Sequence, residues 1–405
     1  MANVSSSNGL EKRPKLRFPG FDEPYRTTPL GEIASLVNRT DPKSNAPIMM
    51  LSAGNGFIMQ SEKYSRDNAG QSLKKYILLK QGELAYNHGA SKAKQFGCCY
   101  ELTEPEARIP YVYHCFKIND HEYTPFIAMA LNNAKMDKQL KRLVSSSVRM
   151  DGLLNISFED YMSVTLHLPS STEQKHIADF LKKIDERIAA QEKLLASLKK
   201  YKRGVVCKVF SEIERECNTV RLGDCVSILR GGSPRPIDAY ITDDPDGINW
   251  IKIGDTSADE LYITRTREKI IPSGAKKSRR VFQGDLILSN SMSFGRPYIL
   301  QIDGCIHDGW LLIRDEDNVF EKRFLCYYLG SDNVIAQYKR FAAGSCVNNL
   351  NSELVGNVEI CCPPHSTQQE IAEMLTVLDS RIAHANRTYE ALLRMRTSLL
   401  QQLFI

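Results

Sequence analysis

The sequence predicts an α+β protein, in which two pseudo-repeated mixed α/β domains, mainly β, are separated by two long coiled-coil helices. Three observations lead to this prediction. The chain has 405 residues, which is enough for two or three domains with separate cores. Two long segments repeat each other at an offset of 194 residues. Each repeat carries apolar residues at coiled-coil spacing.

We expect five parts in chain order, of which the third and the fifth are the two repeats. They are an N-terminal arm (1–24), a first mixed domain (25–169), a central helix (170–212), a second mixed domain (217–362) and a C-terminal helix (363–405).

The composition narrows the class of protein. Hydrophobic residues at 42% and charged residues at 25% are ordinary for a globular protein, and no apolar run approaches the roughly 18 residues of a membrane-spanning helix. The first residues lack the apolar core of a secretion signal, so we expect a cytoplasmic protein without a membrane partner. The eleven cysteines include no CxxC pair, which argues against a zinc ribbon. The net charge of +5 permits a polyanionic partner.

The repeated segments run from 168 to 210 and from 363 to 404. Without a gap they match Pro169 with Pro363, Gln174 with Gln368, Asp185 with Asp379, Leu198 with Leu392 and Phe210 with Phe404. After the prolines at its start, neither segment contains another proline. Each is therefore predicted to form one helix, and its part that corresponds to residues 172–205 would be roughly 50 Å long at 1.5 Å per residue.

Apolar residues in both helices follow the 4-3 spacing of a coiled-coil seam. The predicted seam residues are Ile177, Leu181, Ile184, Ile188, Leu195 and Leu198 in the first helix and Ile371, Leu375, Leu378, Ile382, Tyr389 and Leu392 in the second. The seam is interrupted at matched positions, Gln191 with Ala385 and Lys202 with Arg396, which we expect to fix the register. The helices are thus predicted to pair with each other. The alternative is that each packs on its own domain as an ordinary amphipathic helix.

The segments ahead of the two helices also correspond to each other. Residues 29–37 match 221–229, residues 81–87 match 283–290 and residues 156–169 match 350–363, with offsets that drift between 192 and 202. Short β-branched and aromatic runs between turn residues predict strands, with one helix in each domain, at 124–134 and 322–331. This pattern predicts two copies of one fold whose loops have diverged.

Motifs for catalysis are missing from the sequence. Residues 362–365 read Cys-Pro-Pro-His and lack the amide or carboxylate that an adenine methyltransferase loop requires. The glycine pair at 231–232 lacks the spacing of a nucleotide-binding loop, so we interpret residues 231–236 as a turn. No pattern of acids or histidines indicates a metal site. We therefore expect no catalytic, cofactor-binding or metal-binding residues.

Polar and basic loops at equivalent places in the two domains indicate binding. Arg, Lys, Asn and Ser side chains match the base edges of a DNA major groove, whereas a basic group at 276–280 suits phosphates. The candidate DNA-binding residues are Asn87, His88, Ser91, Lys92, Lys94, Arg149, Lys276, Lys277, Arg279, Arg280, Asn290, Ser291, Arg296, Asn348 and Asn349. For any one of them, the alternative is an ordinary solvated loop.

The doubled motif P-x4-Q-x2-I-A-x2-L-x3-D-x-R-I resembles the specificity subunit of type I restriction-modification systems, as do residues 14–21 and the Gly-Glu-Leu and Gly-Asp-Leu strands. The resemblance covers nearly the whole chain. It implies two target recognition domains, each reading one half of a bipartite asymmetric DNA sequence, with two conserved antiparallel helices as a spacer. It also implies that this chain performs no catalysis.

The resemblance implies several partners. They are double-stranded DNA, two modification (methyltransferase) subunits that use S-adenosylmethionine, and restriction subunits that use ATP and Mg²⁺, while this chain itself holds no cofactor. Helix faces outside the seam are expected to dock the modification subunits. A second hypothesis is a coiled-coil scaffold that binds protein partners rather than specific DNA. A third, an enzyme that acts alone on DNA, is disfavoured by the missing cofactor and metal motifs.

Overall fold

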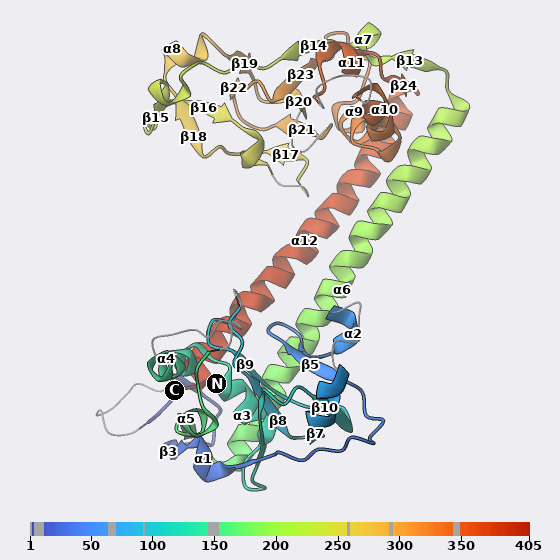
Figure 1. The fold of residues 1–405 in the computed structure, drawn as a ribbon. Coiled ribbons are helices and arrows are strands. Elements are labelled where there is room, and N and C mark those ends of the chain that lie inside the picture. Colours follow the sequence, from blue (N-terminus) through green and yellow to red (C-terminus); the bar gives the residue numbers. More distant parts are fainter. Residues whose placement is uncertain are drawn as a thin grey trace. The chain divides into compact units, whose positions relative to one another are not determined.

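The computed structural model describes residues 2–3, 12–63, 70–91, 94–144, 154–256, 260–290, 295–342 and 349–405. They form two compact units. The first consists of Met1–Gln191 and Thr388–Ile405, and the second of Glu192–Arg387. Both long helices, α6 (Ser171–Glu216) and α12 (His365–Leu403), contribute residues to each unit. Figure 1 shows these helices and the elements named below.

The first unit is a mixed domain that leads into α6. Its strands are β1 (Ala2–Asn3), β2 (Leu16–Arg17), β3 (Arg26–Pro29), β4 (Ala34–Leu36), β5 (Met49–Ser52), β6 (Gly56–Met59), β7 (Ile77–Lys80), β8 (Leu84–Asn87), β9 (Cys98–Glu101), β10 (Glu106–Ile109), β11 (His114–Ile118) and β12 (Thr165–Leu168). Its helices before α6 are α1 (Leu30–Ile33), α2 (Gln60–Lys63), η1 (Gly70–Lys75), α3 (Thr124–Leu131), α4 (Ala134–Leu143) and α5 (Phe158–Met162).

The second unit is a mixed domain that leads into α12. Its strands are β13 (Thr219–Arg221), β14 (Ser227–Arg230), β15 (Ile241–Thr242), β16 (Ile248–Ile251), β17 (Tyr262–Ile263), β18 (Glu268–Ile270), β19 (Arg279–Val281), β20 (Leu286–Ser289), β21 (Pro297–Leu300), β22 (Gly304–Ile306), β23 (Trp310–Arg314) and β24 (Glu359–Cys361). Its helices before α12 are α7 (Leu222–Cys225), η2 (Ile237–Ala239), η3 (Ile253–Asp255), α8 (Pro272–Ala275), α9 (Lys322–Leu329), α10 (Asp332–Ala342) and α11 (Ser352–Gly356).

The two domains share one strand order. The first has an antiparallel sheet β4-β11-β8-β9, and the second has β14-β23-β20-β21, extended by β17 parallel to β21. In each domain the last strand pairs antiparallel with the first, β12 with β3 and β24 with β13. The amide of Leu30 donates to Val164 at 2.8 Å, and the matching amide of Leu222 donates to Val358 at 2.9 Å. The predicted duplication is therefore a duplication of one framework.

The domains differ in their second layer of strands. In the first, β5 pairs with β6 and β7 pairs with β10. In the second, the corresponding strands belong to a five-stranded sheet, β15-β18-β16-β22-β19. The drift of the sequence offset reflects these insertions. Framework strands must keep their register to pack, whereas surface connections change length at little cost.

The prediction of one helix in each domain was wrong. Each domain contains two consecutive helices, α3 with α4 and α9 with α10, followed by short α5 or α11. The break after α3 comes from Asn133, whose side chain accepts from the amides of Lys135 and Met136 and so begins α4. Ser157 begins α5 with a capping box to Asp160. These capping signals were present in the sequence.

A matched glutamine fixes each long helix to its domain. Gln174 is fully buried, accepts from the amide of Tyr123 at 2.9 Å and donates to the carbonyl of Pro169 at 3.0 Å. Gln368 accepts from the amide of Glu321 at 2.7 Å and donates to the carbonyl of Pro363 at 2.9 Å. Tyr123 and Glu321 are the N-cap residues of α3 and α9. Both glutamines therefore make the same clamp, which sets the direction in which each helix leaves its domain.

The helices pair antiparallel in both units. In the first unit the guanidinium of Arg396 binds the carboxylate of Asp185, with Nη2 3.1 Å from Oδ2. In the second unit Lys202 binds Asp379. Lys202 and Arg396 are the matched interruptions of the seam, and the two aspartates are matched as well. Each basic residue that interrupts the seam therefore forms an ion pair with an aspartate of the opposite helix. This pairing explains why a charged residue occupies that seam position.

The ends of the helices belong to the domain cores. Ile177, Leu181 and Ile184 lie in one apolar cluster with domain residues and with Leu403 and Phe404. Phe404 stacks on Phe126 with 5.0 Å between ring centroids, and the matched Phe210 stacks on Tyr328 at 4.4 Å. The cluster of Leu195, Leu198, Ile382 and Ala385 is made by the two helices alone. The helices therefore both pair with each other and pack on their domains.

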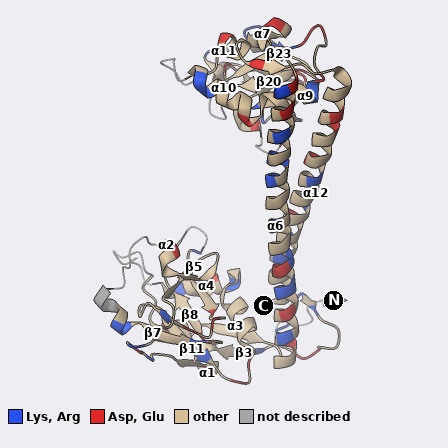
Figure 2. Ribbon diagram, turned by 90° about the vertical axis from the view of Figure 1, so that its right-hand side faces the viewer, with Lys and Arg blue, Asp and Glu red and all other residues tan. Residues whose placement is uncertain are grey.

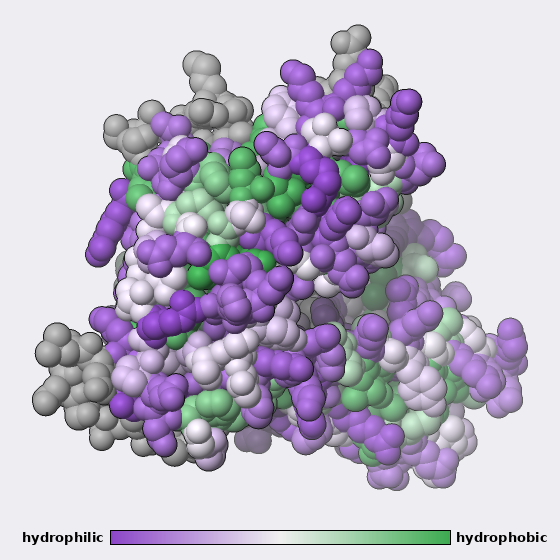
Figure 3. Space-filling model, turned by 90° about the horizontal axis from the view of Figure 1, so that it is seen from below, coloured by the Kyte–Doolittle hydropathy of each residue, from purple (hydrophilic) through white to green (hydrophobic). Residues whose placement is uncertain are grey.

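Apolar side chains are otherwise mostly internal. Figure 3 shows hydrophilic residues over most of the visible face, with hydrophobic residues in small patches. The ten described cysteines are free, and most of them are buried. No helix in the described part of the chain has the length and hydrophobicity needed to cross a bilayer.

Candidate nucleic-acid interface

The predicted polar loops converge in each domain at the end of one strand. In the first, the carbonyl of His88, just after β8, accepts from the amide of Leu154 at 2.9 Å. In the second, the carbonyl of Asn290, just after β20, accepts from the amide of Leu350 at 3.1 Å. In each domain, a residue that follows the second helix, α4 or α10, is therefore hydrogen-bonded to the end of the strand, β8 or β20, where the first polar loop begins. Four candidates, Lys92, Arg149, Ser291 and Asn348, lie outside the described residues.

Several candidates of the first domain hold the loop together. Asn87 accepts from the amide of Gly89 at 2.9 Å, and the Nζ of Lys94 donates to the carbonyl of Asn132 at 2.8 Å. His88 is 6% exposed, and its ring nitrogens lie 2.9 Å from the carbonyl of Leu154 and 3.0 Å from that of Val112. The polar groups of these side chains are therefore bound within the domain. Exposed Ser91 accepts from the amide of Lys94 at 3.0 Å.

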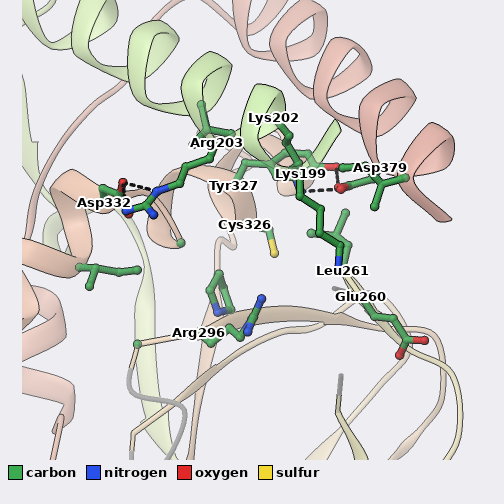
Figure 4. A pocket seen from close by; sticks show the side chains of 16 residues that line it. Lys199, Lys202, Arg203, Glu260, Leu261, Arg296, Cys326, Tyr327, Asp332 and Asp379 are labelled. Atoms are coloured by element: carbon green, nitrogen blue, oxygen red, sulfur yellow. Dashed lines mark hydrogen bonds and ion pairs between the residues drawn. The ribbon is translucent and has the colours of Figure 1, made fainter. Parts of the chain in front are cut away.

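In the second domain too, some candidate side chains are bound within the protein and others are exposed. Asn290 is 3% exposed and donates to the carbonyl of Asp308 at 2.8 Å. Asn349 and Lys276 are exposed. Arg296 lines a pocket, into which its side chain points (Figure 4). A DNA contact by any of these residues stays a prediction.

The pocket around Arg296 lies between β21, α9 and the basic stretch of α6. It has a volume of about 540 Å³ and is lined by Lys199, Lys202, Arg203, Arg296, Glu260, Asp332 and Asp379 among others. Arg203 is paired with Asp332 at 3.1 Å, and the hydroxyl of Tyr327 donates to Asp379 at 2.7 Å. Two of the lining cations, Lys202 and Arg203, are paired with Asp379 and Asp332, as the dashed lines of Figure 4 show. These ion pairs join α6 to α12 and α10 within the second unit.

The basic group at 276–280 lies beside the 231–236 turn. The hydroxyl of Ser278 donates to the carbonyl of Gly232 at 2.7 Å, and the Nε of Arg279 donates to the carbonyl of Arg230 at 3.2 Å. A Cβ at position 231 would lie 2.1 Å from the carbonyl oxygen of His307, so only glycine fits there. The turn is thus held against the ends of β19 and β22. Lys277, Arg279 and Arg280 are exposed beside it.

Asp308 connects this turn to the end of β20. Its carboxylate accepts from the hydroxyl of Ser233 at 2.8 Å and lies 3.4 Å from Nη2 of Arg235. Its carbonyl accepts from Asn290. Burial by itself would raise the pKa of Asp308, but the Ser233 hydrogen bond and, after it, the electrostatic influence of His307 and Arg235 hold that pKa below its usual value. The carboxylate is therefore a fixed negative charge at neutral pH.

His307 does not resemble a catalytic base. Burial lowers the pKa of His307, and the amide nitrogens of Ile253 and Gly309 lie 3.2 Å from its Nε2 and 2.6 Å from its Nδ1, of which the neutral ring can accept a hydrogen bond at one. The imidazole therefore supports the loop. Among the described residues, no group of three or more His, Cys, Asp or Glu side chains is arranged to hold a metal ion.

Sequence reasoning did not select Arg230, Arg235 or Asp308. The signal was the Gly-Gly pair followed by Ser-Pro-Arg-Pro, which we interpreted only as a turn. That interpretation fits the backbone but misses the charges that the turn presents.

Basic residues also line α6, where Lys182, Lys183, Lys193, Lys200, Arg203 and Lys208 are exposed. Figure 2 shows this run of Lys and Arg along the helix. Of the predicted seam residues, Ile177, Leu181, Ile184, Leu195, Ile371, Leu375, Ile382 and Leu392 are buried, while Ile188, Leu198, Leu378 and Tyr389 are half-buried. The seam is apolar apart from its charged interruptions, and exposed Lys and Arg residues outnumber exposed Glu residues on α6.

Comparison with known proteins gives consistent results. The family described as type I restriction modification DNA specificity domain matches residues 74–200 and 214–394. The type I restriction enzyme MjaIX specificity subunit of Methanocaldococcus jannaschii is 26% identical over 199 residues, which is 48% of this chain and 45% of that relative. The MjaVIII specificity subunit of the same organism is 20% identical over 295 residues, 66% of this chain and 67% of the relative.

Two solved structures have a similar fold. The S subunit of a type I restriction-modification system from M. genitalium has a TM-score of 0.61 at 14% identity, over 97% of this chain and 99% of that one. A chain from a structure that concerns assembly of a type I R-M system has a TM-score of 0.58 at 18% identity, over 96% and 98%. At these identities the likeness concerns the fold alone.

Proposed function

Because this chain belongs to the family of type I restriction-modification DNA specificity domains, we propose that it is the non-catalytic subunit that selects the DNA sequence for such a complex. Each domain reads one half of a bipartite asymmetric target. The two long helices set the gap between the halves and dock the modification subunits.

One observation supports this proposal above the others. The two domains repeat one strand order, yet they differ in the loops and in the second layer of strands. A protein that must read two unrelated half-sites needs a common framework that attaches to the helices in the same way, with different residues facing the bases. The Gln174 and Gln368 clamps provide that common attachment.

The partners follow from the same role. They are double-stranded DNA, two modification subunits and restriction subunits. S-adenosylmethionine belongs to the modification subunits, and ATP and Mg²⁺ belong to the restriction subunits, all in the cytoplasm. The relatives that match are named specificity subunits. Neither the family nor these relatives support the alternative of a scaffold that binds proteins only.

The test is adenine methylation mapping by single-molecule sequencing. DNA from cells that express this chain with its cognate modification subunit is compared with DNA from cells that lack the chain. We expect a split, asymmetric methylated motif that depends on this chain. Replacing residues 218–362 with the second domain of another specificity protein serves as the control, because it is expected to change one half of the motif. A complex that forms but methylates no new motif and binds DNA without sequence preference would contradict the proposal.

A further inference from the structure

The turn at residues 231–236 presents an exposed arginine beside a carboxylate. Arg235 is 82% exposed, and Asp308, 42% exposed, lies 3.4 Å from its Nη2. Among the described residues, no hydrogen bond or ion pair involves the Nε or Nη1 of Arg235. One edge of the guanidinium is thus directed by a carboxylate, while the remaining donors face solvent.

The support behind Arg235 is rigid. The hydroxyl of Ser233 holds the other carboxylate oxygen of Asp308 at 2.8 Å, and the amide of Asp308 donates back to Ser233 at 3.2 Å. Gly231 packs against His307 so closely that no other residue fits. The turn and Asp308 therefore form one hydrogen-bonded unit, and Asp308 offers the guanidinium of Arg235 a partner on one side before any ligand arrives. Fixed donors lose less conformational entropy on binding.

The turn also lies where DNA is expected. Asn290, at the start of the candidate base-reading loop, donates to the carbonyl of Asp308 at 2.8 Å. Exposed Lys277, Arg279 and Arg230 surround the turn and can neutralise phosphates. The turn therefore combines phosphate-binding cations with one directed guanidinium.

The first domain has no equivalent. There the arginine that follows strand β4 is Arg39, whose Nε donates to the carbonyl of Leu78 at 2.9 Å and whose Nη2 binds Glu83. That arginine is bound within its own domain. Among the described residues, an exposed arginine beside a carboxylate is present at this place in the second domain and not in the first, as expected of a residue that distinguishes two half-sites.

We propose that Arg235 reads a guanine in the half-site of the second domain and that Asp308 is a positioning residue for it. This inference rests on the proposed function. A guanidinium donates two parallel hydrogen bonds to O6 and N7 of guanine, a pattern that no other base presents in the major groove. Asp308 binds one hydrogen of Nη2, and the second Nη2 hydrogen with the neighbouring donor on its edge of the guanidinium remains for the base. Lys277 and Arg279 contribute affinity without sequence information.

The experiment uses the full chain in complex with its modification subunit. After the methylated motif is known, binding is measured for the target duplex and for duplexes in which each guanine in turn is replaced by 7-deazaguanine, which lacks N7. The wild-type complex is expected to lose about 5- to 150-fold in affinity at one guanine of the second half-site. R235A is expected to bind the unmodified target weaker by a similar factor and to show no further loss at that guanine.

Three further variants separate the roles. D308N is expected to lose part of the sensitivity at the same guanine only. R279A is expected to weaken binding equally for all sequences and to reduce the salt dependence by about one charge. The matched control is R221A, because Arg221 is an exposed arginine of the same domain that binds only the neutral side chain of Asn357. R221A should leave the pattern of affinities for the modified duplexes unchanged. Thermal unfolding of each variant shows whether the domain remains folded.

The outcomes are distinct. If R235A keeps the wild-type sensitivity at every guanine, or if it weakens all sequences equally, Arg235 does not read a base and the inference is overturned. A second half-site without guanine in either strand overturns it as well. If the wild-type complex recognises no split motif, the proposed function itself fails. A motif that is present but insensitive to R235A leaves the function intact and removes only this inference.

Discussion

At the scale of single residues, the buried pair of Arg17 and Glu173 attaches the N-terminal arm to the start of α6. Their side chains are 4% and 0% exposed, and two hydrogen bonds of 2.9 and 2.7 Å join them. The carboxylate also lies 3.5 Å from the hydroxyl of Tyr25, which in turn reaches the carbonyl of Leu403. One pair therefore connects the arm and both long helices within the first unit.

Replacing Glu173 with Gln is expected to lower the free energy of unfolding by about 3–5 kcal/mol, since the guanidinium of Arg17 would stay buried without its counter-charge. Urea unfolding followed by circular dichroism measures this change. The double variant R17M/E173L should be less destabilised than E173Q, because it buries no charge. The control K175Q, at an exposed position on the same helix turn, should change stability by no more than about 0.5 kcal/mol. Equal losses for E173Q and K175Q would contradict the structural role.

At the scale of elements, the ion pairs made by the two basic residues that interrupt the seam help to fix the register of the helices. Lys202 and Asp379 are 26% and 22% exposed, so solvent screens their attraction only in part. A one-heptad slip in one direction would place Ala372 against Lys202 and Leu195 against Asp379. The pair therefore disfavours wrong alignments even where it adds little stability.

The register can be tested by exchanging charges. K202E places two carboxylates together and is expected to lower the free energy of unfolding by about 1–3 kcal/mol. The double variant K202E/D379K should recover part of the lost free energy of unfolding. The recovery is incomplete because the hydroxyl of Tyr327 loses its hydrogen bond to Asp379. K200E, at an exposed position of α6, is the control and should be nearly neutral. If the double variant were no more stable than K202E, the two residues would not be paired.

At the scale of the whole molecule, the helices are expected to set the gap between half-sites. With 46 residues α6 is about 69 Å long, and one heptad corresponds to about 10 Å, or about three base pairs. The gap should therefore depend on the number of heptads. The reading of the bases in each half-site should not depend on the number of heptads.

Removing residues 188–194 together with 387–393 deletes one heptad from each helix between the two ion pairs. Asp185, Arg396, Lys202 and Asp379 remain, so the antiparallel register should survive. Methylation mapping is expected to show the same two half-sites with the original gap lost or shortened. A deletion in α6 alone is the control, because it mismatches the helices and should impair the complex. An unchanged gap in the double deletion would exclude the helices as the determinant of spacing.

The sequence by itself determined the features that depend on local patterns. Heptad spacing predicted the long helices, and matched residues such as Gln174 and Gln368 revealed the duplication, because helix periodicity and helix starts are written within a few turns of chain. The tertiary structure decided which polar residues are free to bind DNA. His88, Lys94 and Asn290 were predicted as readers, yet their side chains are held by backbone carbonyls brought from 18 to 66 residues away along the chain. Arg235 gained its role from Asp308, 73 residues later. Burial and partners of a side chain depend on contacts that only folding creates.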